Sequence, residues 1–237
     1  MEKALKRGTF RLGALALFGT LALSQAARAA PVIVPVGLNA GDTYRLAFVT
    51  ADFNTTGGST SIAFYNALVN GFGFAATGIS GWTAIVSTAS VNAIDNTNTA
   101  GPGGAPIYLL DGTTKIADDN ADLWDGSLDA ALNVTETGAA LGAGAVLTGT
   151  NPFTGTGIPG LTLGSGSIEY GQVNLSNAGW AAVGTAPNFV PTLRFYAISD
   201  ILTVGGGGTE VPEPGSLALV GLALAGLGAM RRRKTAG

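Results

Sequence analysis

The densest group of side chains able to do chemistry is the acidic segment at residues 118–129 (DDNADLWDGSLD). Calcium prefers several oxygen ligands, and Asp or Asn at alternating positions of a loop can supply them. The candidate calcium ligands are Asp118, Asn120, Asp122, Asp125 and Asp129. Leu123 stands where an EF-hand requires Gly, so the segment is not an EF-hand. Two interpretations remain: a less regular calcium site, and an acidic loop whose side chains cap turns.

Paired carboxylates could also hydrolyse glycosidic bonds, one acting as general acid and the other as base or nucleophile. The candidates are Asp118, Asp122, Asp125, Glu136 and Glu169. Their spacing singles out no pair, and the chain contains neither G-x-S-x-G nor S-x-x-K. We therefore expect no catalytic residues, no enzymatic activity and no cofactor, with calcium as the one alternative. A secreted carboxylate-dependent polysaccharide hydrolase is the enzymatic alternative.

Composition excludes several classes of protein. The chain of 237 residues has no Cys and no His, so it has no disulfides, no thiolate or imidazole chemistry and no ordinary zinc or haem ligands. Residues 30–209 carry three basic and twelve acidic residues, a net charge of −9. Such a body repels phosphate backbones, so we expect no nucleic-acid partner. Two of its basic residues, Arg45 and Arg194, fall in expected strands, where we expect each to pair with a carboxylate or with carbonyl groups.

The N-terminus has the three zones of a secretory signal peptide. A basic opening is followed by the uncharged apolar run 12–23 and then by small residues. Twelve helical residues span about 18 Å, which is too short to cross a bilayer. Ala27 and Ala29 form an A-x-A-like cleavage site that would leave Ala30 as the first residue. We therefore assign 1–29 as a signal peptide and expect the Sec translocon and signal peptidase as partners.

The C-terminus carries a second three-part signal. A Pro-Glu-Pro motif precedes the apolar run 216–230, which is followed by a basic cluster. The residues that define its two ends are Val211, Pro212, Glu213, Pro214, Arg231, Arg232, Arg233 and Lys234. These features resemble the PEP-CTERM sorting signal of exported bacterial proteins. The resemblance implies recognition and cleavage by an exosortase, a membrane transpeptidase-like enzyme.

The apolar run 216–230 predicts a transmembrane helix near the lower length limit for spanning. The basic cluster after it should stay on the cytoplasmic side, which places the body outside the cell membrane. The alternative to cleavage is a permanent anchor in the membrane. Residues 205–210, which begin with four glycines, are expected to form a flexible linker between the body and the sorting signal at 211–237.

The remaining body, residues 30–204, is long enough for one α+β domain. We expect short antiparallel strands and at least one packed helix. The helix is expected at 62–70, preceded by the capping residues Ser59 to Ser61 and ended by Gly71. Strands are expected at 44–50, 82–87, 107–117 (a hairpin around Asp111-Gly112), 167–175 and 193–204.

The order of these elements and several short motifs resemble a C-type-lectin-like or endostatin-like domain. The motifs are Trp82 to Ser87 (WTAIVS), Trp124-Asp125-Gly126, Leu147 to Thr150 (LTGT) and Trp180. The family's usual cysteines are absent, and so are its Glu-Pro-Asn and Trp-Asn-Asp motifs for calcium and sugar. The resemblance implies the fold, and we expect the three tryptophans to be core residues.

These observations together predict a non-enzymatic exported protein. It would be tethered in the inner membrane before processing and would then reach the cell surface or the extracellular matrix. There it would serve in adhesion, carbohydrate binding or biofilm matrix structure, with extracellular polysaccharide as a partner. The alternatives are the hydrolase and a calcium-dependent binding protein tethered to the membrane.

Overall fold

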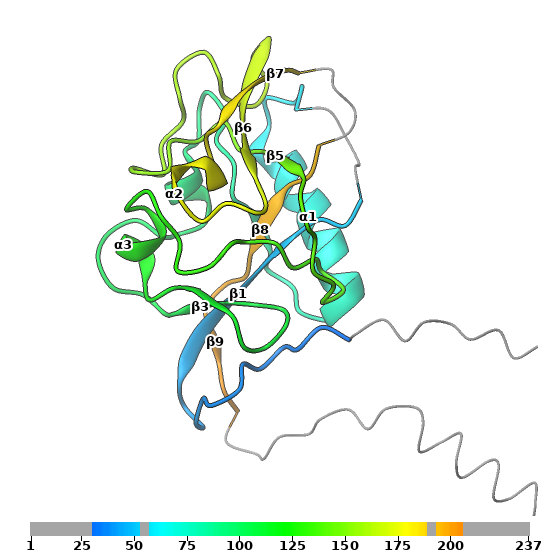
Figure 1. The fold of residues 1–237 in the computed structure, drawn as a ribbon, viewed down its shortest axis with the longest axis vertical. Coiled ribbons are helices and arrows are strands. Elements are labelled where there is room, and N and C mark those ends of the chain that lie inside the picture. Colours follow the sequence, from blue (N-terminus) through cyan, green and yellow to red (C-terminus); the bar gives the residue numbers. More distant parts are fainter. Residues whose placement is uncertain (1–29, 53–56, 189–192, 206–237) are drawn as a thin grey trace, which may run out of the picture.

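The computed structural model describes residues 30–52, 57–188 and 193–205 (Figure 1). They form two sheets and a few helices, so the fold mixes α and β elements with strands predominating. The larger sheet contains β1 (Thr43–Val49), β2 (Thr83–Ala84), β3 (Ile107–Leu109), β4 (Lys115–Ala117), β8 (Tyr196–Ile198) and β9 (Leu202–Thr203). The smaller sheet contains β5 (Ala145–Leu147), β6 (Ser167–Gln172) and β7 (Gly184–Pro187). The helices are α1 (Ile62–Thr77), α2 (Ala93–Asn96), α3 (Asn120–Leu123) and a 3-10 turn at Ala178–Trp180.

Strand β1 is the centre of the larger sheet, whose order is β2-β8-β1-β3-β4 with β9 beside the start of β1. Six of its seven residues are buried, because it is covered on both faces. It pairs antiparallel with β8 but parallel with β3, with Arg45 opposite Ile107. The expectation of antiparallel strands is therefore wrong for the pair β1 and β3, although the other named strand pairs are antiparallel. The long connection through α1 and β2 returns the chain to the sheet in the same direction as β1.

Helix α1 is longer than its sequence signals indicate. It continues through Gly71 and ends at Gly78, which has φ +74° and donates its backbone N–H to Phe74 O at 2.9 Å. The expected end at Gly71 is wrong, because the left-handed residue that closes the helix is Gly78. Ser61 is the N-cap residue as expected, although its side chain makes no capping bond. The helix packs against β2 and β8.

The expected strand at 193–204 is divided into β8 and β9. Ser199 interrupts it, because its hydroxyl accepts a hydrogen bond from Leu46 N–H at 2.9 Å while its own N–H donates to Leu46 O. Strand β9 then pairs with the start of β1, with Tyr44 opposite Leu202. The expected strand at 82–87 is also shorter than predicted, because ladder pairing to β8 is limited to Thr83 and Ala84. The hairpin at 107–117 is present as β3 and β4.

The core contains all three tryptophans, as expected. Trp82 and Trp180 are 1% and 0% exposed, and Trp124 is 6% exposed with its indole N–H donating to Thr99 Oγ1 at 2.8 Å. Both arginines are buried and bind carbonyl groups. Arg45 donates to three carbonyl oxygens, and Arg194 donates to those of Thr50 and Ala51.

No helix within the described ranges has both the length and the apolar character that a membrane span requires. The signal peptide with Ala27 and Ala29, the linker after Gly205, the expected transmembrane helix and the sorting residues lie outside the described residues. Ala30, the expected first residue after cleavage, is the first described residue and is exposed.

Candidate functional site

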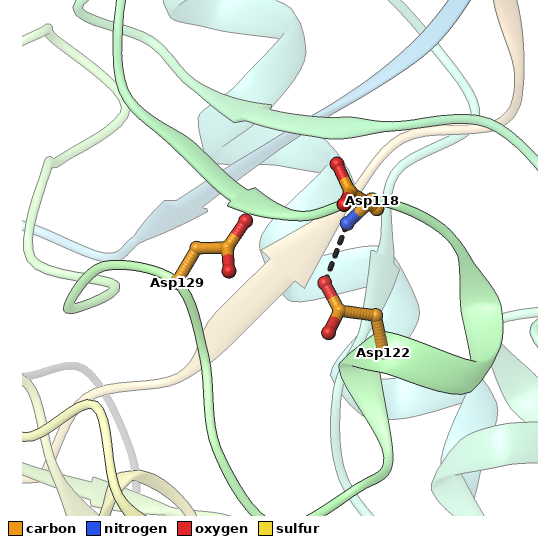
Figure 2. A group of neighbouring side chains, drawn as sticks. All are labelled: Asp118, Asp122 and Asp129. Carbon is orange, nitrogen blue, oxygen red and sulfur yellow. Dashed lines mark hydrogen bonds between the residues drawn. The ribbon is translucent and has the colours of Figure 1, made fainter.

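The fold brings together three of the five candidate calcium ligands. Asp118 follows β4, Asp122 lies on α3 and Asp129 lies in the loop that follows α3 (Figure 2). One carboxylate oxygen from each lies within 4.8 Å of the others. The backbone N–H of Asp118 donates to Asp122 Oδ2 at 2.6 Å, which holds α3 against the end of the strand. We call these three side chains the acidic cluster.

Lys115 supplies a positive charge to the acidic cluster. Its ammonium group forms an ion pair with Asp118 and lies 3.5 Å from Asp129 Oδ2. Lys115 is the first residue of β4, and Asp118 follows directly after the last residue of this strand, so the ion pair spans the end of β4. The cluster therefore has a counter-ion from the chain itself, and a bound cation would have to compete with the ammonium group.

Of the other two candidate ligands, Asp125 makes a local turn, whereas Asn120 Oδ1 is buried without a hydrogen-bond partner among the described residues. Asn120 is 8% exposed and lies against Gly104, where a Cβ would be 2.6 Å from its Oδ1. Asp125 Oδ1 accepts hydrogen bonds from the N–H and hydroxyl groups of Ser127 at 2.8 and 3.0 Å, which makes a local turn. Asp119 caps α3 by accepting from the N–H groups of residues 121 and 122. The turn-capping interpretation therefore describes these Asp residues well.

Electrostatics disfavour the ionised form of Asp122. Burial raises the pKa of Asp122, and repulsion by the neighbouring carboxylates of Asp129, Asp125 and Asp119 raises it further. The ammonium of Lys115 acts in the opposite direction. Three carboxylates of this kind could bind a hard cation such as calcium, because carboxylate oxygens are its preferred ligands.

Glu136 and Glu169, the two glutamates in the expected hydrolase set, each bind the backbone and do not belong to the acidic cluster. Glu136 Oε2 accepts from Ala51 N–H at 2.8 Å, and Glu169 Oε1 accepts from Gly184 N–H at 2.9 Å. Burial raises the pKa of both carboxyl groups. Their contacts lie on separate elements, so the described residues give these glutamates a structural use.

A second polar site is a hollow between α1 and the start of β2, lined in part by Asn66, Asn70 and Asp200. Sequence analysis did not identify these three residues. One signal for the first two was available: Asn66 and Asn70 are spaced four apart in an otherwise apolar helix, so they lie on one face. Asp200 is 130 residues further along the chain, and no local pattern links it to them.

Comparison with known families identifies the C-terminal segment. Residues 210–234 match the PEP-CTERM protein-sorting motif. No curated protein matches the chain. The protein therefore carries a PEP-CTERM sorting signal: it is an exported surface protein that an exosortase processes, after an initial stage at the membrane.

Proposed function

We propose that the body, residues 30–204, is a non-enzymatic domain that binds extracellular polysaccharide at the cell surface or in the matrix, where it serves in adhesion or matrix structure. The observation that carries this proposal is the sorting signal at 210–234, which directly follows the folded body and directs it out of the cell. The resemblance of this signal implies a producer of extracellular polysaccharide, so the exported body would meet that polymer.

The topology of the larger sheet supports a lectin-like body. The first strand, β1, pairs antiparallel with the last strands, β8 and β9, so the chain enters and leaves at the same end (Figure 1). Helix α1 follows β1, and a separate small sheet is inserted before β8. The order of a first strand, a helix and a closing strand is the feature on which the resemblance to C-type-lectin-like domains rests.

The use of the carboxylates supports a binding role over catalysis. In a glycosidase, two carboxyl groups face each other across the scissile bond. Here Glu136 and Glu169 hold backbone N–H groups, and the carboxylate of Asp118 is paired with Lys115. We therefore assign Glu136, Glu169 and Asp118 to structural contacts rather than to bond cleavage.

A calcium-dependent binding protein is the second candidate. It is favoured by the acidic cluster, in which three carboxylate oxygens lie within 4.8 Å of one another. Calcium binding there requires the Lys115 ammonium group to move away from Asp118 and Asp129, because a bound calcium ion would repel it. The two candidates differ in whether chelation of calcium abolishes binding.

The test is cosedimentation of the mature protein, purified from its producing cells, with the extracellular polysaccharide of the same cells. We expect the protein to sediment with the polysaccharide in the presence of EDTA and to release no reducing ends. Loss of polysaccharide binding in EDTA would favour the calcium-dependent candidate. Release of reducing ends would contradict the non-enzymatic assignment, and absence of binding would overturn the proposal.

A further inference from the structure

An open hollow of about 350 Å³ lies between α1, the segment before β2 and the turn from β8 to β9. Its volume falls in the range of small-molecule binding sites. Its lining residues include Asn66, Ala67, Asn70, Gly81, Thr83 and Asp200. Among the described residues that line the hollow, none is Lys or Arg, and Asp200 is the one acidic residue.

Asn70 presents a fixed hydrogen-bond donor to the hollow. Its Oδ1 accepts from the backbone N–H groups of Gly81 at 3.0 Å and Trp82 at 3.1 Å, which sets the orientation of the amide. Within the described residues its Nδ2 group has no hydrogen-bond partner, so both N–H groups are available to a ligand. Asn66 differs, because its side-chain oxygen and nitrogen both bind Asn96.

Asp200 presents an acceptor beside this donor. Its carboxylate lies directly over Gly81, where a Cβ would be 2.5 Å from Asp200 Oδ2, and Gly81 has φ +86°. A side chain at position 81 would therefore both strain the backbone and displace the carboxylate. No side-chain hydrogen bond of Asp200 occurs among the described residues, so its two oxygens can accept from a ligand.

Apolar side chains are also exposed on α1 near the hollow. Ala67 is exposed on α1, and Phe74, one helical turn after Asn70, is 56% exposed. An amide donor beside a carboxylate acceptor, with apolar surface next to them, matches a pair of neighbouring hydroxyl groups on a ring with C–H faces. The carboxylate and the net charge of −9 of the body disfavour an acidic sugar. Metal binding is not favoured, because Asn70 Oδ1 already accepts two hydrogen bonds.

We propose that this hollow binds a sugar unit of a neutral polysaccharide, with Asn70 donating to one hydroxyl and Asp200 accepting from its neighbour. The inference rests on the proposed function and assigns its site and ligand class. It also separates the binding site from the acidic cluster, which lies on β4, α3 and the loop after α3.

Two substitutions probe the hollow with little change to the fold. Asn70→Asp keeps the oxygen that holds Gly81 and Trp82 N–H and replaces the donor with an acceptor. Ala67→Glu adds a charged side chain at an exposed helix position that lines the hollow. Ala75→Glu is the matched control, because Ala75 is exposed on the same helix and is not among the lining residues.

The experiment is native affinity electrophoresis of the mature protein in gels containing dextran, galactomannan or soluble cellulose ether as neutral probes, and polygalacturonate as the acidic probe. We expect wild type and Ala75→Glu to be retarded by at least one neutral probe. Both hollow variants should bind it about tenfold more weakly, since a donor or the space for the ring is lost. Thermal midpoints show whether each variant is folded. If Asn70→Asp does not fold, the binding of Ala67→Glu alone tests the assignment of the hollow.

Equal retardation of wild type and Ala67→Glu would overturn the assignment of the hollow while leaving polysaccharide binding intact. Retardation by polygalacturonate alone would overturn the neutral ligand class. If neither these probes nor the cells' own polysaccharide is bound, both the site and the proposed function fall.

Discussion

The backbone N–H of Gly41 donates to the carbonyl oxygen of Val204 at 3.0 Å, so the two ends of the folded body lie side by side. Val204 N–H in turn donates to Asp42 O at 2.9 Å. This double contact closes the sheet at the position where the sequence continues into the linker and the sorting signal. The last strand among the described residues, β9, ends at Thr203, before the matched motif at 210–234, so processing within that motif removes none of the described strands.

This relationship predicts that the sorting signal determines location and not folding. A chain that stops after Gly208 should show the same thermal midpoint as the mature protein, because β9 and its pairing with β1 are retained. It should fail to reach the cell surface, which fractionation of the producing cells would reveal. A large fall in the thermal midpoint would show that the segment beyond residue 208 contributes to the fold.

Arg45 should be a major contributor to stability. It is 2% exposed and donates to the carbonyl groups of Thr97, Asn98 and Ser199, which ties β1 to two loops. Arg45→Met fills similar volume but leaves these carbonyls without a donor, so we expect a loss of about 2–4 kcal/mol in the free energy of unfolding. Urea denaturation measures this loss. A change below about 0.5 kcal/mol would show that water replaces the guanidinium at no cost.

Lys115 should control the response of the acidic cluster to calcium. In wild type its ammonium group pairs with Asp118 and Asp129, so millimolar calcium should leave the thermal midpoint unchanged. Lys115→Met removes a partly exposed ion pair and should cost less than about 1 kcal/mol. The variant leaves three carboxylates uncompensated, so calcium should raise its midpoint. A rise in wild type of the same size would instead favour the calcium-dependent candidate.

The pH dependence of stability should change in Glu136→Gln. Burial raises the pKa of Glu136 in the folded state, so the folded protein binds its proton more tightly than the unfolded chain does. The free energy of unfolding contributed by this group is therefore present at low pH and is lost as pH rises from about 4 through the raised pKa. Gln at position 136 retains an oxygen that can accept from Ala51 N–H. Because its amide does not titrate, the variant does not lose this free energy of unfolding as pH rises.

Denaturation curves at a series of pH values test this sign. The stability of Glu136→Gln relative to wild type should increase as pH rises from about 4 to neutrality. A relative decrease over the same range would mean that the backbone hydrogen bonds to the carboxylate and its attraction to Arg194, which lower the pKa of Glu136, together outweigh its burial.

Local patterns predicted the central elements well. The alternating apolar residues of 44–50 correspond to β1, and the Asp111-Gly112 turn joins β3 to β4. Capping signals did not locate the end of α1, because Gly71 and Gly73 both lie inside the helix and the helix ends at Gly78. Gly73 is accommodated there because the Trp82 ring fills its side-chain space, with a Cβ reaching 2.5 Å from that ring. That contact joins segments that no local pattern relates.

All three residues of the acidic cluster were among the five candidate calcium ligands, and the hollow was missed. The density of Asp residues brought Asp118, Asp122 and Asp129 to attention, but only the folded hairpin shows Lys115 between two carboxylates. Asn70 and Asp200 meet because β8 is beside β2 in the sheet, which is a consequence of long-range pairing. Sequence spacing carries no information about such a pair.

The most direct test of the central claim, an exported protein processed at both ends, is the intact mass of the protein in the extracellular and surface fractions of its producing cells. The account predicts a species that begins at Ala30 and ends near Pro212, inside the matched sorting motif. A species that retains Arg231 to Lys234, or a protein found wholly in the cytoplasm, would contradict it.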